Sequence, residues 1–321
     1  METEDSGTMS VQDKKIELRL GTRASLLALC QANWIKSRVE EQNPAVTVRL
    51  VHIKTSGDKI NTPLFKVGGK GLFVKEIEEA LLREEVDLAV HSAKDLPALI
   101  PDGLTLMAFP EREDPRDALI TRDGKRFSEI PSGGKVGTGS LRRQAQLLNL
   151  RPDLEVVPLR GNLDTRLRKL SSLKLDAIIL ASAGLRRMCW EARVSEYLEP
   201  EVMLPAIGQG VLAIEGRKAD ERVYQILAPL NHLPTQVSVL TERAFLKRLG
   251  GGCQVPIAGL AKVEGEKLIF IGLVAGVDGK KIVKGKVEGS LGKNEELGER
   301  LAEELLAKGA EGILREVYKK E

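Results

Sequence analysis

Short apolar segments of strand character alternate with segments of helical periodicity along most of this 321-residue chain. Ile16–Leu20 predicts a strand, and Ser25 caps a predicted helix whose apolar residues recur at helical spacing from Leu26 to Ile35. Such alternation is typical of α/β folds, in which helices cover a mostly parallel sheet. Because the chain is longer than one hydrophobic core usually supports, the sequence predicts two or three domains.

Two segments mark places where the chain crosses between predicted domains. Glu111–Arg116 is charged and interrupted by proline, and Leu204–Val211 is a second candidate crossing. After a long predicted helix at Thr235–Leu249, three predicted strands are separated by turn sequences such as Asp278-Gly279, and two helices follow. This last block therefore predicts a separate α+β domain.

The composition excludes several classes of protein. Aromatic residues make up only 3% of the chain, which argues against recognition of single-stranded nucleic acid by base stacking. The net charge of +3, from 49 basic and 46 acidic residues, is too balanced for a nucleic-acid-binding protein. No stretch approaches the roughly 18 apolar residues that a membrane span needs. The three cysteines and three histidines have neither disulfide nor metal-ligand spacing, which favours a reduced, cytosolic setting.

The segment Asp87–Pro97 is the strongest candidate for ligand chemistry. Leu88–His91 predicts a short buried strand, and the polar turn behind it holds Lys94 and Asp95 before Pro97 prevents helical continuation. Polar groups just beyond the carboxyl end of a strand are where open α/β sheets bind ligands. A carboxylate beside a lysine is expected to stay ionised and to stabilise developing positive charge. A turn aspartate that only caps the backbone fits the same pattern.

A second candidate site combines a glycine-rich helix start with arginines. Gly137–Ser140 leads into a predicted helix whose first turn holds Arg142 and Arg143. Backbone N–H groups at a helix start bind anions, whereas cations there oppose the helix dipole, so we expect an external anion to offset both arginines. A solvated charged surface fits the pattern too. Further cations of interest are Arg23, Arg160, Arg166 and Arg193, and Lys66 and Lys70 of the long loop at 54–71.

A faint internal repeat relates the two candidate sites. Gly21–Ser25 resembles Gly137–Ser140, and Asp87–Leu96 resembles Asp176–Leu185. Two similar α/β lobes that face each other across a cleft would explain the repeat, and so would two unrelated strand-to-helix turns. In the second unit a glycine occupies the position that corresponds to Asp95, so this carboxylate has no twin.

The three cysteines fall in different surroundings. Cys253 follows three glycines in a loop after a basic helix end. Its thiol fits a nucleophile, a covalent attachment point or a buried filler, and no histidine lies near in sequence to favour the first. Cys30 and Cys189 fall on apolar helical faces, so we expect both in the core.

The chain closely resembles porphobilinogen deaminases, also called hydroxymethylbilane synthases, from about Ile16 to Tyr318. The matching stretches, in family order, are Gly21–Ser25, Lys66–Glu76, His91–Pro97, Glu111–Ala118, Gly137–Gln144, Leu159–Asn162, Leu204–Gly210 and Gly251–Ile257. So many long motifs together are highly specific. One departure is Gly139, where threonine or serine is common, so one hydroxyl contact to a carboxylate is expected to become a backbone contact.

The resemblance implies an α/β fold with two periplasmic-binding-protein-like (type II) lobes around a cleft and a small C-terminal α+β domain. We therefore expect a disordered lead at 1–15, a first lobe from 16–110 and 211–230, a second lobe at 111–210 and a C-terminal domain at 231–321. The mobile loop at 54–71 belongs to the first lobe, and the C-terminal domain carries Cys253.

The resemblance also implies a dipyrromethane cofactor, built from substrate and held by a thioether to Cys253. Such an enzyme condenses four porphobilinogen molecules head to tail, releases ammonia and then hydrolyses off the linear tetrapyrrole hydroxymethylbilane. Loss of ammonia from porphobilinogen leaves a cationic azafulvene, which an ionised carboxylate stabilises. We expect a cytoplasmic monomer that binds porphobilinogen and no metal, nucleic acid or membrane.

Individual roles follow where residues match the family's motifs. Asp95 is expected to be catalytic. Expected contacts to the cofactor, besides Cys253, are Ser25, Lys94, Thr138, Ser140, Arg142, Arg143 and Gly161. Expected contacts to the substrate are Arg23, Arg160, Arg166, Arg193, Gln209, Phe73, Lys66 and Lys70.

Two other interpretations stay open on the residues alone. A non-enzymatic pair of anion-binding lobes, like a solute receptor, explains the lobes, the loop and the arginines, but it gives Cys253 no role. A hydrolase with a cysteine nucleophile lacks a placed base.

Overall fold

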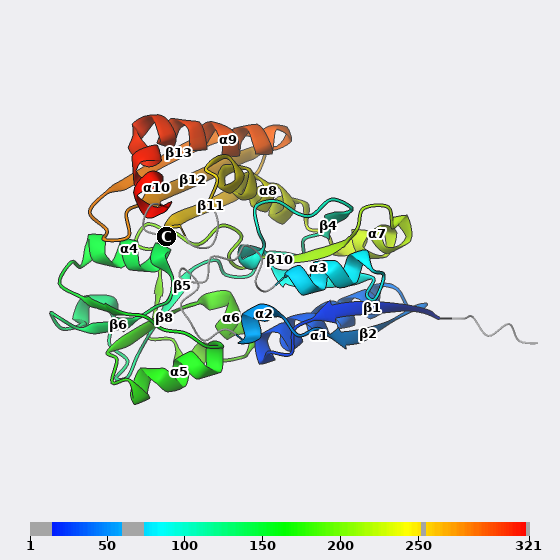
Figure 1. Ribbon diagram of the computed structural model, residues 1–321, viewed down its shortest axis with the longest axis horizontal. Coiled ribbons are helices and arrows are strands. Elements are labelled where there is room, and N and C mark those ends of the chain that lie inside the picture. Colours follow the sequence, from blue (N-terminus) through cyan, green and yellow to red (C-terminus); the bar gives the residue numbers. More distant parts are fainter. Residues whose placement is uncertain (1–14, 60–73, 252–254, 319–321) are drawn as a thin grey trace, which may run out of the picture.

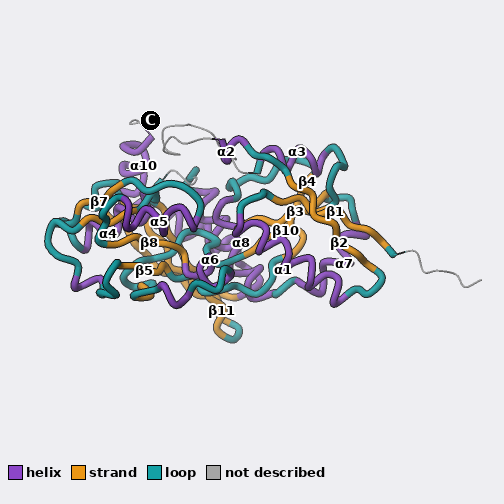
Figure 2. The backbone as a smooth tube through the Cα atoms, turned by 90° about the horizontal axis from the view of Figure 1, so that it is seen from below, coloured by secondary structure: helices purple, strands orange, loops and turns teal. Residues whose placement is uncertain are grey.

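The computed structural model describes residues 15–59, 74–251 and 255–318. Two α/β lobes lie at opposite ends of the long axis, and a smaller third domain lies against the second lobe (Figures 1 and 2). The predicted fold class of two α/β lobes with a small C-terminal α+β domain is therefore confirmed. Among the described residues, no helix has the length and apolar character to cross a membrane.

The first lobe is a five-stranded sheet in the order β2-β1-β3-β10-β4. Strand β10 runs antiparallel to both of its neighbours, whereas β1 runs parallel to β2 and β3. Apolar residues of α1 and α7 pack on one face of this sheet, and those of α3 pack on the other. The elements are β1 (Ile16–Thr22), α1 (Leu26–Gln42), β2 (Val46–His52), α2 (Ser56–Lys59), α3 (Lys75–Leu82), β3 (Leu88–Ser92), β4 (Leu104–Ala108), β10 (Leu212–Arg217) and α7 (Glu221–Leu227), with 3-10 turns at Ala93–Asp95 and Ala228–Leu230.

The second lobe is a five-stranded sheet in the order β7-β6-β8-β5-β9. Strand β5 runs antiparallel to both of its neighbours, and α4 packs on the face opposite α5 and α6. The elements are β5 (Asp117–Thr121), β6 (Lys135–Gly137), α4 (Leu141–Leu150), β7 (Glu155–Val157), α5 (Leu163–Ser172), β8 (Ala177–Ala181), α6 (Ser182–Arg187) and β9 (Glu196–Leu198), with 3-10 turns at Phe127–Glu129 and Glu191–Arg193.

The two sheets share one topology, so the internal repeat is structural. Strands β6, β7, β8, β5 and β9 take the places of β1, β2, β3, β10 and β4. The match extends to single hydrogen bonds: the Arg19 N–H donates to the Asp87 carboxylate at 2.8 Å, and the Lys135 N–H donates to the Asp176 carboxylate at 2.7 Å. Asp87 precedes the strand that leads to Asp95, and Asp176 precedes the strand that leads into α6.

The third domain is a three-stranded antiparallel sheet with helices packed on it. Its core contains Phe245 and Phe270, whose rings meet edge to face with centroids 5.1 Å apart. The elements are α8 (Leu233–Arg248), β11 (Ile257–Glu264), β12 (Lys267–Ala275), β13 (Ile282–Ser290), α9 (Asn294–Leu305) and α10 (Glu311–Tyr318), with a 3-10 turn at Leu291–Lys293 and a π-type turn at Leu306–Ala310.

A buried carboxylate joins the third domain to the segments that cross between the lobes. Glu242 of α8 accepts hydrogen bonds from the Arg112 guanidinium at 2.6 Å and from the Gly208 N–H at 2.6 Å. It also accepts one from the Ala261 N–H in β11 at 2.9 Å. Since a buried charge needs such partners, this side chain holds both crossings and the third domain together.

The Asp278-Gly279 turn also attaches the third domain to the second lobe. Gly279 adopts φ +72°, and a Cβ atom there would lie 2.6 Å from the Ala145 carbonyl oxygen of α4. Glycine therefore permits the turn and its close approach to the helix. The Asn149 amide donates to the Gly279 carbonyl at 2.9 Å, which fixes the contact.

Candidate active site

The central strand of the first lobe ends directly at Asp95. Strand β3 is buried from Leu88 to His91, and a single 3-10 turn, Ala93–Asp95, follows it. Leu96 is buried behind the turn, which anchors it, while the Asp95 side chain is exposed. The structure thus places a solvent-accessible carboxylate on a rigid support, as the sequence predicted.

Lys94, the residue before Asp95, lies close to charged groups of the second lobe. The pKa of Lys94 is lowered to about 8, chiefly by burial; the charges of Arg143 and Arg142 also lower it, whereas those of Asp95 and Asp117 oppose the shift. Charges of both lobes therefore act on this one side chain. The candidate sites of the two lobes therefore converge on one place.

In the second lobe, capping bonds fix the start of α4. The Thr138 hydroxyl accepts a hydrogen bond from the Ser140 N–H at 3.2 Å, and the Ser140 hydroxyl accepts one from the Arg143 N–H at 3.4 Å. A Cβ atom at Gly139 would lie 2.5 Å from the Leu159 carbonyl oxygen, so this position leaves no room for a side chain. The predicted helix start is confirmed, and it sets the direction of the two arginines that follow.

Both arginines of α4 are buried against one internal carboxylate. Asp117, which is 0% exposed, lies 2.8 Å from a guanidinium nitrogen of Arg142 and 2.8 Å from one of Arg143. Although burial opposes ionisation, these two charges hold the pKa of Asp117 well below its ordinary value. We expected an external anion to offset the arginines, and that expectation needs correction because much of the balancing charge is internal.

The cluster still carries more positive than negative charge. Nε of Arg142 is buried without a hydrogen-bond partner among the described residues. Arg166 of α5 lies nearby. Its pKa is lowered to about 10, chiefly by burial; the charges of Arg143 and Arg160 also lower it, and Asp95 of the first lobe opposes the shift. Lys94 and these four arginines thus surround two carboxylates, which favours the binding of anions.

Gly161 positions Arg166. Its carbonyl accepts a hydrogen bond from Arg166 Nε at 2.8 Å, and its φ of +114° is one that glycine adopts readily. The neighbouring Arg160 carbonyl accepts from Lys169 Nζ at 2.9 Å, and burial lowers the pKa of the Arg160 guanidinium. The loop after β7 therefore holds two arginines at the edge where β6 and β8 also end.

Arg23 and Ser25 occupy the loop of the first lobe that corresponds to the loop after β6. They follow β1, which is parallel to β3, so they lie at the same sheet edge as Asp95. The Ser25 hydroxyl accepts a hydrogen bond from the Ala28 N–H at 3.4 Å and caps α1, as predicted. Because this hydroxyl only accepts in the cap, its own hydrogen is available for donation.

Of two further expected substrate contacts, one joins the cluster through Asp117 and the other has no contact with it among the described residues. Gln209 is buried, and its amide donates to the Pro115 carbonyl at 2.6 Å and to the Asp117 carboxylate at 3.0 Å, so it orients the internal counter-ion. Arg193 is exposed, and its guanidinium lies 5.8 Å from the centre of the Trp190 ring. None of the contacts found among the described residues joins Arg193 to the cluster.

Sequence reasoning missed two charged residues. Asp117 lies within the Glu111–Ala118 stretch, but it has no local pattern that marks a partner 25 residues away in the chain. Arg187, at the end of α6, donates to the Gly210 carbonyl at 2.7 Å. Burial lowers the pKa of Arg187 to about 10, although Glu113 and Cys30 oppose the shift. Four other predicted site residues, Cys253, Lys66, Lys70 and Phe73, lie outside the described residues.

Comparison with known proteins places the chain among enzymes of one kind. A family model described as "Porphobilinogen deaminase, dipyromethane cofactor binding domain" matches residues 18–225, and "Porphobilinogen deaminase, C-terminal domain" matches residues 237–307. The curated porphobilinogen deaminase of Pelobacter propionicus is 55% identical over 306 residues, which cover 95% of this chain and 98% of that protein. That of Geobacter metallireducens is 56% identical over 306 residues, with 95% and 96% covered. Among solved structures, a probable amino-acid transporter binding protein from Bacillus subtilis is 11% identical with a TM-score of 0.43, over 68% of this chain and 90% of that one.

Proposed function

Because the chain belongs to the porphobilinogen deaminase family, we propose that it condenses four porphobilinogen molecules head to tail and then releases the linear product by hydrolysis. It is a transferase of tetrapyrrole synthesis and uses a dipyrromethane cofactor. The observation that carries the assignment of residues is the convergence of Asp95 with Lys94 and the arginines of the second lobe. Family membership sets aside the solute-receptor and cysteine-hydrolase alternatives.

The residues present fit a dipyrromethane, whose pyrrole rings each carry an acetate and a propionate. The cluster has an excess of cations and a buried Arg142 Nε that lacks a hydrogen-bond partner among the described atoms. Lys94, Arg142 and Arg143 would hold the cofactor carboxylates, and the hydroxyls of Ser25 and Ser140 would donate to them. When bound through Cys253, the cofactor supplies the pyrrole carbon from which the product grows.

Asp95 is the proposed catalytic residue. Its exposed carboxylate lies at the end of a buried strand beside Lys94, with Arg166 close by. It would accept hydrogen bonds from pyrrole N–H groups and stabilise the positive charge that develops as ammonia leaves porphobilinogen. A carboxylate fixed by the fold does this without reorganisation during the reaction.

The remaining cations would bind the carboxylates of incoming substrate. Arg23, Arg160 and Arg166 lie at the facing sheet edges, and planar guanidinium groups suit carboxylates. Thr138 and Gly161 support this edge through backbone geometry, and Lys66, Lys70 and Phe73 are proposed contacts from the segment outside the described residues. Cysteines without disulfide spacing support a cytoplasmic protein, and the balanced charge supports the absence of nucleic-acid binding. That the protein is a monomer is proposed from its resemblance to the family.

The test combines product formation with intact mass. Purified protein incubated with porphobilinogen should release ammonia and form a linear tetrapyrrole, and its mass should exceed the sequence mass by two pyrrole units. The protein should also turn coloured with an acidic aldehyde reagent. Cys253→Ser should lack the extra mass, the colour and the turnover. Active protein with an unmodified mass would refute covalent attachment of the cofactor.

A further inference from the structure

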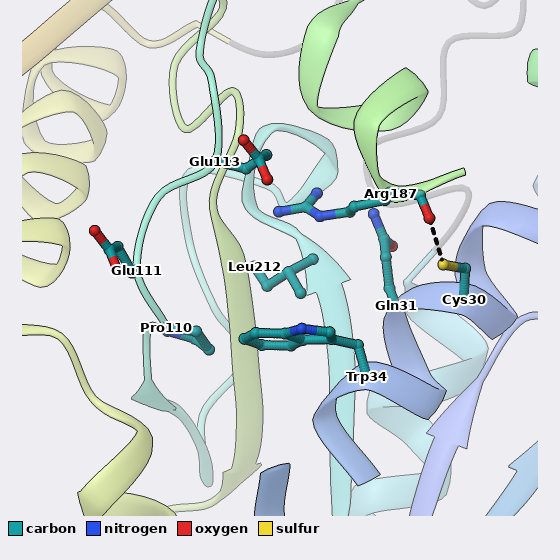
Figure 3. A pocket seen from close by; sticks show the side chains of 8 residues that line it. All are labelled: Cys30, Gln31, Trp34, Pro110, Glu111, Glu113, Arg187 and Leu212. Atoms are coloured by element: carbon teal, nitrogen blue, oxygen red, sulfur yellow. Dashed lines mark hydrogen bonds between the residues drawn. The ribbon is translucent and has the colours of Figure 1, made fainter. Parts of the chain in front are cut away.

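Two cysteines from different lobes meet where α1 packs on α6. Cys30 of α1 donates its thiol hydrogen to the Arg187 carbonyl at the end of α6, with sulfur and oxygen 2.8 Å apart (Figure 3). Cys189 lies two residues beyond this carbonyl. The helices pack closely, since a Cβ atom at Gly184 of α6 would lie 3.7 Å from the Leu27 side chain of α1. We expected Cys189 in the core, and that prediction is wrong because α6 ends at Arg187 and leaves Cys189 exposed.

The turn after α6 holds Cys189 in an unusual conformation. Its φ is +55°, in the left-handed region that residues with a Cβ atom seldom adopt. The Cys189 N–H donates to the Arg186 carbonyl and the Trp190 N–H donates to the Leu185 carbonyl, each at 2.9 Å. This is the Schellman arrangement, whose left-handed position is usually glycine. A cysteine here is locally disfavoured, so a role for its side chain is worth seeking.

The two thiols also interact electrostatically. Burial raises the pKa of the Cys30 thiol, the nearby Cys189 raises it further, and Arg187 opposes the shift. Because the Cys30 thiol contacts the Arg187 carbonyl and Cys189 lies two residues further along the same turn, the two cysteines are close in the fold. Cys30 is therefore the less reactive thiol, and exposed Cys189 is the one that meets solvent first.

A cavity of about 130 Å³ opens beside Cys30, on the side of the segment that crosses between the lobes. Gln31 and Trp34 of α1 line it together with Glu113 and Arg187 (Figure 3). The cavity lies outside the cluster of Asp95 and the α4 arginines, so the cysteine pair is distinct from the proposed active site. It also gives the Cys30 side chain room to change its rotamer.

We propose that Cys30 and Cys189 form a reversible disulfide that links the two lobes, with a low-molecular-weight disulfide of the glutathione type as oxidant. The Cys189 thiolate attacks one sulfur of the oxidant, which forms a mixed disulfide and releases one thiolate. Cys30 then loses its proton to solvent and attacks the Cys189 sulfur, which releases the second thiolate. Two protein thiols are oxidised to one disulfide, and one small disulfide is reduced to two thiols.

The bridge would restrain the lobes at their contact. It connects the helix that begins at Ser25 with the turn after α6, so α1 and α6 could no longer separate. This consequence for turnover rests on the proposed function, because a site that accepts successive substrates needs the facing edges to adjust. We expect bridged protein to condense porphobilinogen several-fold more slowly than reduced protein, and dithiothreitol to restore the rate.

Peptide mapping tests the bridge directly. Holoprotein treated with oxidised glutathione and digested without reductant should yield one linked peptide that contains Cys30 and Cys189, lighter by two hydrogens than the two separate peptides. Cys30→Ser should instead keep a glutathione adduct on Cys189, and Cys189→Ser should yield no linked peptide. Two stable glutathione adducts on the wild-type protein would overturn the proposal.

Two further measurements separate the bridge from the proposed function. Peptide mapping detects the bridge by mass, so it gives an answer even if the protein makes no tetrapyrrole. Unchanged turnover of fully bridged protein would refute the claim that the bridge slows turnover by restraining the lobes. Cys189→Gly should raise Tm in reducing buffer, where the wild type is not bridged, because glycine relieves the left-handed turn. With oxidised glutathione only the wild type can be stabilised by the bridge, so the advantage of the variant should shrink.

Discussion

Each lobe has an aspartate before its third strand, Asp87 or Asp176, which accepts a hydrogen bond from the backbone of the neighbouring parallel strand. Beyond the matched strands the lobes differ. In the first lobe β3 runs into a single 3-10 turn that presents Asp95 to solvent. In the second lobe β8 runs directly into α6, which buries Gly184 at the corresponding place. The same scaffold therefore presents a carboxylate in one lobe and a packed helix in the other.

The buried charges are distributed in the opposite way: the second lobe has them where the first lobe has uncharged side chains. Asp117 lies opposite Ala181 in β8, and its counterpart in the first lobe is Leu212, opposite Ser92 in β3. The helix start after β6 carries Arg142 and Arg143, whereas the matching start of α1 carries Leu27 and Ala28. The helix start of the second lobe thus carries two buried arginines, whereas the matching helix start of the first lobe carries none. The first lobe presents the exposed carboxylate of Asp95 and adds the cations Lys94 and Arg23.

Asp95→Asn should produce the largest effect and tests the role of the first lobe most directly. The amide cannot stabilise developing positive charge as a carboxylate does, so we expect kcat to fall by about 10²- to 10⁴-fold. Tm should not change, because the Asp95 side chain is exposed. Asp102→Asn, at another exposed position of the same lobe, is the matched control for both measurements. Near-normal turnover of Asp95→Asn would show that Asp95 is not catalytic and that the described residues of both lobes serve only to bind.

Asp117→Asn tests the second lobe. It removes the counter-charge shared by two buried arginines, so we expect the free energy of unfolding to fall by about 3–5 kcal/mol in urea titrations at pH 7. Asp123→Asn changes an exposed carboxylate of the same lobe and should leave the urea midpoint unchanged. An equal loss in both variants would contradict a special role for the buried group.

The pH dependence of the Asp117 variant has a definite sign. The folded pKa of Asp117 is lowered, so its contribution to stability is present above its unfolded pKa of about 3.9 and is lost as pH falls. The difference between wild type and Asp117→Asn should therefore be full at pH 7 and shrink below about pH 4. A difference that is constant with pH would show that the carboxylate does not act through its charge.

A buried acid of the first lobe should behave in the opposite way. Burial and the neighbouring Glu215 raise the pKa of Glu78 in α3 to about 7, and His91 opposes the shift. A raised folded pKa gives stability that is present at low pH and lost as pH rises to 7. Between pH 4 and pH 8, wild type should lose about 3–4 kcal/mol relative to Glu78→Gln. Parallel stability curves for the two proteins would refute the shift.

The smallest effects are expected at the two equivalent helix starts. Ser25→Ala and Ser140→Ala each remove one capping hydrogen bond, and each should lower the free energy of unfolding by about 1 kcal/mol. Threonine at either position keeps the accepting oxygen and should restore most of the loss. Clearly unequal losses would show that the shared topology does not extend to the energetics of the caps.

Features that depend on neighbours in sequence could be predicted from the sequence. The cap at Ser25, the helix start after Gly137–Ser140, the turn at Asp278-Gly279 and the polar turn that holds Asp95 all rest on local patterns that the structure confirms. The alternation of strands and helices likewise predicted both sheets. Strands that helices cover on both faces of a sheet are short apolar segments, whatever their order in the sheet.

Features that depend on strand register could not be predicted. Asp117 meets Arg142 and Arg143 only because β5 inserts between β8 and β9, and Gln209 turns to Asp117 for the same reason. Helical spacing placed Cys189 in the core, but the helix ends two residues too early for the pattern to apply. Residues that are brought together by the order of strands in a sheet have no periodic pattern in the sequence that would predict their contact.

The place of β10 in the first sheet has a consequence for synthesis on the ribosome. Strand β4 pairs with β10 alone, and β10 lies more than 100 residues further along the chain. The strands of the second sheet, in contrast, all lie between Asp117 and Leu198. The first sheet therefore cannot be completed, with β10 between β3 and β4, until the chain of the second lobe has been synthesised.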